Sequence, residues 1–124
     1  MRYAVIVKTE KRLDTALFFC QACQAKGHKV LRVFLMGSAV LIANRLRVSA
    51  PDTFDMTAAW EQFAQSSDLI IQVCSTSAAK YGILSAEQAH YFGKSDYIMS
   101  PHFEANGFVE CFTSCHDADR TIML

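Results

Sequence analysis

Five short apolar runs that alternate with helix-like segments are the feature that most constrains this fold. The strand-like runs occupy residues 2–8, 28–36, 68–74, 96–100 and 120–124. The segments between them carry apolar residues at three- and four-residue spacing, or open with a capping residue, as helices do. This alternation predicts an α/β protein, because parallel strands need crossovers that place helices on both faces of the sheet. We therefore expect a doubly wound, mainly parallel, five-stranded sheet of the flavodoxin-like kind.

The chain has the length of one domain. Its 124 residues, 52% of them apolar, are enough to bury a stable core without disulfides. Capping residues mark the ends of the expected helices. Gly27 ends the first helix, and Ser38, Asp55 and Ser85 begin later ones. We expect a single domain over residues 1–124.

Charge and composition exclude several kinds of partner. Twelve basic and twelve acidic residues cancel, so no broad positive surface predicts tight, direct binding of nucleic acid. No apolar run reaches the roughly 20 residues that span a bilayer, and the first run is too short for a signal peptide. We expect a cytoplasmic protein whose five cysteines stay reduced.

Cys74 is the candidate nucleophile. It ends the third apolar run, and Ser75, Thr76 and Ser77 follow it in what reads as a helical turn. In an open α/β sheet, function gathers beyond the carboxyl ends of the strands. The partial positive charge at a helix N-terminus favours a thiolate or persulfide anion. The alternative is that Cys74 packs as a small apolar residue, as many buried cysteines do.

The other cysteines have simpler interpretations. Cys20 and Cys23 lie on the apolar stripe of the first helix, so core packing is favoured over a redox pair, which would open a helix. Cys111, Cys115 and His116 offer three ligands for zinc, but a fourth ligand and the usual tight knuckle are missing. The loop after the first strand is charged rather than glycine-rich, which disfavours a nucleotide. We expect no cofactor and no metal.

Segments along nearly the whole chain follow a family pattern. They are MRYAVIVKTE, TALFFCQACQAKGHKVLRVFLM, VLIAN ending at Asn44, FDMTAAWEQF, LIIQVCSTSAAKYGI and ADRTIML. In this order and spacing they resemble the DsrE/DsrF-like sulfur-relay family, and most closely its DsrE/TusD branch. Cys74 is similar to the family's reactive cysteine, which accepts a sulfane sulfur as a persulfide and passes it to the next protein. With that role, Ser75 and Thr76 are candidates to stabilise the persulfide anion, and Lys80 is a candidate to contribute charge.

The resemblance also implies partners. In the TusD setting the relay feeds 2-thiolation of a tRNA wobble uridine, within a complex that includes TusB- and TusC-like chains. In the DsrE setting of sulfur-oxidising bacteria, related chains form a heterohexamer with DsrF- and DsrH-like proteins. We therefore expect sulfur-donor and sulfur-acceptor proteins as partners, and a homo- or hetero-oligomer, either a trimer or a hexamer.

Two other functions remain open from the sequence. Some members of the superfamily lack the reactive cysteine and act as scaffolding partners, so a non-catalytic subunit or ligand-binding module is the main alternative. A dithiol redox protein that uses Cys20 and Cys23 is a weaker one, because a position within a helix gives poor geometry for a disulfide.

Overall fold

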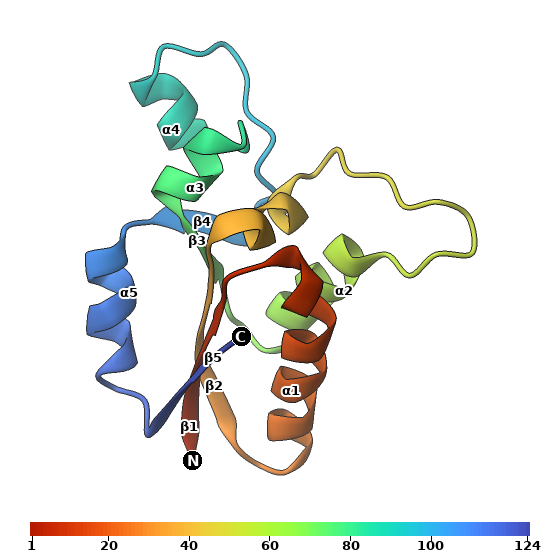
Figure 1. Cartoon of the computed structure of the whole chain (residues 1–124), viewed down its shortest axis with the longest axis vertical. Helices are drawn as coiled ribbons and strands as arrows, with labels where there is room; N and C mark the ends of the chain where they lie inside the picture. The colour runs from red at the N-terminus through yellow and green to blue at the C-terminus, as the bar shows by residue number, and fades with distance from the viewer.

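The computed structural model describes all residues, 1–124, and has a five-stranded sheet at its centre (Figure 1). The strands are β1 (Arg2–Val7), β2 (Lys29–Leu35), β3 (Ile71–Cys74), β4 (Phe103–Asn106) and β5 (Arg120–Met123). All neighbouring strands are parallel, in the order β4-β3-β2-β1-β5. The predicted α/β class and five-stranded parallel sheet are confirmed. The order differs from the flavodoxin order 2-1-3-4-5 in one respect: the last strand, rather than the second, lies beyond β1.

Helices cover the two faces of the sheet unequally. Helices α1 (Leu13–Ala25) and α2 (Met56–Ser66) lie on one side, and α5 (Phe108–Cys115) lies alone on the other (Figure 1). The short helices α3 (Ser75–Lys80) and α4 (Ala86–Tyr91) lie beyond the carboxyl ends of the strands, at the top of Figure 1. None of the helices has the length and apolar character needed to cross a membrane.

Strand alternation divides the core into two clusters, because successive side chains of a strand point to opposite faces. Val5 and Val7 belong to a cluster of 23 buried residues, which includes side chains of α1 and α2. Ile6, between them, faces the other way. It belongs to a small buried cluster on the α5 side whose four members are Ile6, Phe34, Cys74 and Cys111.

Most of the predicted helix ends are confirmed. The Asp55 carboxylate accepts the backbone N–H of Ala58 over 3.1 Å at the start of α2. Ser85 and Gln88 form a reciprocal capping box at the start of α4. The prediction for Ser38 is wrong: the 3-10 helix η2 (Gly37–Ala43) begins one residue earlier. The Ser38 hydroxyl instead accepts the backbone N–H of Glu10 over 3.0 Å.

The predicted fourth strand, residues 96–100, is wrong. Met99 forms only an isolated antiparallel bridge to Asn44, and Ser100 donates its backbone N–H to the carbonyl of Ala43 over 2.8 Å. These partners lie at the end of η2, so the segment packs outside the sheet. The fourth strand is β4, whose sequence FEAN alternates apolar and polar residues because only one of its faces packs on the main core.

Candidate functional site

Cys74 lies where β3 gives way to α3. It is the last residue of the strand, pairs in register with Asn106 of β4, and precedes the first residue of α3. The strand is buried along its whole length, and β2 and β4 flank it in the sheet. The sequence prediction of a cysteine at the carboxyl end of a central strand, beside a helix N-terminus, is confirmed.

The Cys74 side chain is covered, with only 1% of its surface exposed. It shares the small buried cluster with Ile6, Phe34 and Cys111, and Met36 and Cys115 pack against that cluster. A thiol that exchanges sulfur with other proteins should lie at a rim or a subunit interface, whereas this side chain is closed to solvent within the chain. The reason is α5, which lies over the sheet on this side and places Cys111 against the strand end.

Three cysteines meet at this position. Cys111 and Cys115 are four residues apart on α5, so they lie on the same helix face. Cys111 is 7% exposed and Cys115 is half-buried. Burial raises the pKa of the Cys111 thiol to about 12, and negative charge on Cys115, a hydrogen bond with Cys115 and charge on Cys74 add to this rise. Each thiol of the group therefore affects the ionisation of the central one.

The residues after Cys74 are held in place by hydrogen bonds to other loops. The Ser77 hydroxyl accepts the backbone N–H of Gly37 over 3.0 Å, and the Ser75 carbonyl accepts the Gln88 side-chain amide over 3.0 Å. The hydroxyls of Ser75 and Thr76 form no hydrogen bond within the chain. Both hydroxyls therefore have no partner within the chain, and their role in holding a persulfide anion stays a prediction.

Lys80 is not brought to Cys74. It lies in the last turn of α3, and its Nζ sits 5.9 Å from the centre of the Tyr81 ring in a cation–π arrangement. It lies six positions after Cys74, a rise of roughly 9 Å along a helix. Its geometry gives no support to a direct role at the thiol.

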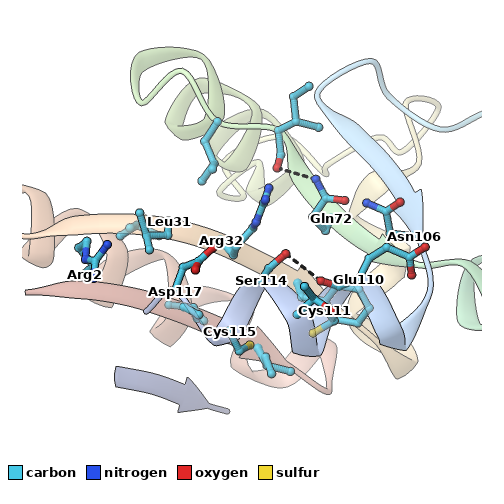
Figure 2. Close-up of a pocket in the computed structure, with 18 of the residues that line it drawn as sticks. Arg2, Leu31, Arg32, Gln72, Asn106, Glu110, Cys111, Ser114, Cys115 and Asp117 are labelled. Carbon is cyan, nitrogen blue, oxygen red and sulfur yellow. Dashed lines mark hydrogen bonds between the residues drawn. The ribbon is translucent and has the colours of Figure 1, made fainter. Parts of the chain in front are cut away.

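A groove of about 1030 Å³ separates α5 from the outer face of the sheet. Figure 2 shows its two walls, with Arg32, Gln72 and Asn106 on strands and Cys111 and Cys115 on the helix. Gln72 is buried, and its Oε1 accepts no hydrogen bond. The groove was not predicted, because helices were expected to cover both faces of the sheet. The polar residues Arg32 and Gln72, within the runs 28–36 and 68–74, were the available signal.

The other candidate groups do not form sites. Cys20 and Cys23 are buried in the main core, as the apolar stripe predicted, and burial raises the pKa of Cys20 to about 12. His116 follows α5 and is exposed. No three His, Cys, Asp or Glu side chains converge in a metal-binding arrangement, including Cys111, Cys115 and His116.

Comparison with known proteins gives consistent results. A model of the DsrE/DsrF-like family matches residues 1–124. Sulfurtransferase TusD of Pectobacterium carotovorum is 32% identical over 112 residues, which cover 90% of this chain and 87% of the relative. A sulfurtransferase TusD homolog of Pseudomonas aeruginosa is 32% identical over 107 residues, which cover 86% of this chain and 82% of the relative.

One solved structure shares the fold. The crystal structure of the ychN protein from E. coli superimposes with a TM-score of 0.74 and covers 100% of both chains. Its sequence identity to this chain is 18%, so the similarity concerns the fold alone.

Proposed function

Because the chain belongs to the DsrE/DsrF-like family, we propose that it is a sulfurtransferase that carries sulfane sulfur as a persulfide on Cys74. Relatives that cover most of the chain are named sulfurtransferase TusD. The observation that carries the assignment to one residue is the position of Cys74, between the end of β3 and the first turn of α3. Of the five cysteines, it is the one at the carboxyl end of a strand.

The chemistry is thiol–persulfide exchange. A thiolate attacks the outer sulfur of a donor persulfide, a new S–S bond forms, and the donor's inner sulfur leaves as a thiolate. An acceptor thiolate then attacks the outer sulfur of the Cys74 persulfide and releases Cys74 as a thiolate. Each proton lost by an attacking thiol is regained by a leaving one, and no net oxidation occurs. The exchange therefore requires no cofactor or metal.

The free hydroxyls beside Cys74 suit an anion at this position. Ser75 and Thr76 occupy the first turn of α3 and have unused hydroxyls. A persulfide anion would gain hydrogen bonds from such donors and from the partial positive charge of the helix end. Lys80 has no such supporting geometry and is left out of the proposed mechanism.

Sulfur transfer between proteins requires partners, and α5 provides an apolar surface. Phe108, Val109 and Phe112 are 43%, 76% and 61% exposed on this helix. Such a patch is typical of protein interfaces. We propose a homo- or hetero-oligomer, trimeric or hexameric, that works in the cytoplasm. We propose donor and acceptor proteins of the sulfur relay as partners, with tRNA 2-thiouridine synthesis as the destination of the sulfur.

A second function is favoured by one observation, the burial of Cys74 at 1% exposure. A thiol that stays covered would make the chain a non-catalytic subunit in a sulfur-metabolism complex. Such a subunit would bind its partners and carry no sulfur.

Mass spectrometry of the intact protein separates the two functions. The wild type would be incubated with a cysteine desulfurase and L-cysteine, and then desalted. The carrier predicts an adduct of about 32 Da, one sulfur atom, that persists in Cys20→Ser and that peptide mapping of the alkylated wild type places on Cys74. A wild type that gains no sulfur while it still binds its partner proteins would support the subunit function and overturn the carrier.

A further inference from the structure

The burial of Cys74 raises the question of how sulfur reaches it. The groove beneath α5 is lined by Cys111 and Cys115, whereas Cys74 is not among its lining residues. A donor persulfide that enters the groove would therefore meet the helix cysteines first. The following inference rests on the proposed function and concerns the route that the sulfur takes.

The three thiols form a continuous series from the surface to the strand end. Cys115 is half-buried and packs against the buried cluster that contains both Cys111 and Cys74. Cys111 lies between the other two, one helical turn from Cys115. Figure 2 shows both helix cysteines on the side of α5 that lines the groove. Exposure decreases along the series, since Cys111 is 7% and Cys74 1% exposed.

We propose that Cys115, Cys111 and Cys74 form a persulfide relay that carries sulfane sulfur between the groove and the buried strand end. Cys115 exchanges sulfur with partner proteins, Cys111 transfers it, and Cys74 stores it. Sulfur leaves by the same thiols in reverse order, because the groove is the side from which partners reach them.

Each transfer in the relay is balanced. Cys111 attacks the outer sulfur of a Cys115 persulfide while its proton passes to the leaving Cys115 sulfur, and the S–S bond of that persulfide breaks. The Cys74 thiolate then attacks the outer sulfur now held by Cys111 and releases the Cys111 thiolate. The proton given up by each attacking thiol passes to the thiolate that leaves. The sulfane sulfur keeps its oxidation state, so no oxidant or reductant is consumed.

The covered position has a chemical advantage for a carrier. A persulfide on an exposed cysteine reacts with any small thiol in solution, which removes the outer sulfur. A persulfide on Cys74 is shielded by Ile6 and Phe34, so solution thiols would have to exchange first with Cys115. The relay therefore explains how a buried cysteine can both protect and deliver its sulfur.

A quenched time course tests the relay. Wild type and variants would be mixed with a cysteine desulfurase and L-cysteine, stopped by rapid alkylation, and analysed as peptides. Trypsin places Cys74 in the peptide 48–80, apart from the helix cysteines in 95–120. Cleavage after Phe112 then separates Cys111 from Cys115.

The relay predicts that persulfide appears on Cys115 before Cys74 in the wild type. In Cys111→Ala and in Cys115→Ser, the initial rate of Cys74 loading falls about tenfold or more. The matched control is Cys23→Ala, which removes a buried thiol on the opposite face and leaves the rate unchanged. Cys115 is half-buried, so its replacement by serine keeps the test valid if Cys111→Ala does not fold.

Failure of the relay and failure of the carrier give different results. If Cys74 loads at the wild-type rate in both helix variants, the relay is overturned and the carrier stands. If Cys74 acquires no sulfur in the wild type, the proposed function and the relay both fail.

Discussion

The backbone N–H of Gly37 donates to the Ser77 hydroxyl over 3.0 Å and ties the loop after β2 to the first turn of α3. Gly37 has a positive φ of 56°, and a Cβ at this position would lie 2.5 Å from the Lys8 carbonyl oxygen. Three segments far apart in sequence therefore meet at the glycine. The turn that carries Cys74 depends on this close approach.

Gly37→Ala is expected to destabilise the fold strongly. The substitution adds left-handed backbone strain of about 1–2 kcal/mol and a clash of about 1–3 kcal/mol. Gly82→Ala is the matched control, because Gly82 also has a positive φ, 72°, but open space around its Cβ position. Urea denaturation would measure the free energy of unfolding of both variants, and we expect a larger decrease for Gly37→Ala. Equal decreases in the two variants would contradict the close packing at Lys8.

Native alkylation is expected to follow exposure. Iodoacetamide at pH 8 would label Cys115 first, because it is the only cysteine that is not fully buried. Cys20 and Cys74, at 0% and 1% exposure, would react at least about tenfold more slowly until urea is added. Peptide mass spectrometry reads both rates. Labelling of Cys74 as fast as Cys115 would show that α5 does not cover the strand end in solution.

Alkaline pH is expected to lower the stability through Cys20. Burial raises the pKa of this thiol from 9.0 to about 12, so above pH 9 the unfolded chain loses a proton that the folded chain keeps. The stabilisation is complete below pH 9 and is lost as the pH rises from 9 towards 12. The free energy of unfolding, measured by urea denaturation between pH 8 and 10.5, should fall less steeply in Cys20→Ala. An unchanged slope would mean that the Cys20 thiol ionises as easily in the folded protein.

The exposed face of α5 is expected to hold an oligomer together. Phe112→Ser changes a side chain that is 61% exposed, so folding stability should change by less than about 0.5 kcal/mol. Light scattering should show a mass above the 13.9 kDa of one chain for the wild type and a lower mass for the variant. Phe18→Ser, at 59% exposure on α1, is the control. A monomeric wild type, or equal effects of both variants, would place the interface elsewhere or exclude it.

Local signals in the sequence were sufficient for most of the fold. Asp55 and Ser85 act as the predicted caps. A short side chain with an oxygen acceptor, placed just before a helix, can accept a free backbone N–H of the first turn. The apolar stripe through Cys20 and Cys23 correctly placed both in the core. The prediction of a strand at residues 96–100 was wrong because a buried irregular segment and a strand can have the same composition. Residues 103–106 alternate in polarity and were the actual strand.

The site was less predictable than the fold. The position of Cys74 followed from strand order and turn residues, but its burial depended on where α5 lies, and helix packing is a long-range property. Nothing in the spacing of Cys111 and Cys115 indicates which strand end their helix face contacts. The predicted contribution of Lys80 charge at Cys74 has no support in the geometry, because the Lys80 side chain packs on the neighbouring Tyr81 ring. The sequence does not reveal this packing either.

Cold cyanolysis tests the central claim most directly, because cyanide converts the outer sulfur of a persulfide to thiocyanate, which can be counted. Wild type and variants would be loaded with a cysteine desulfurase and L-cysteine, desalted, unfolded and treated with cyanide. The account predicts about one thiocyanate per chain for wild type and Cys20→Ser, and at least about twofold less for Cys74→Ser, in which sulfur can rest only on the two helix cysteines. Equal amounts of thiocyanate from wild type and Cys74→Ser would contradict it.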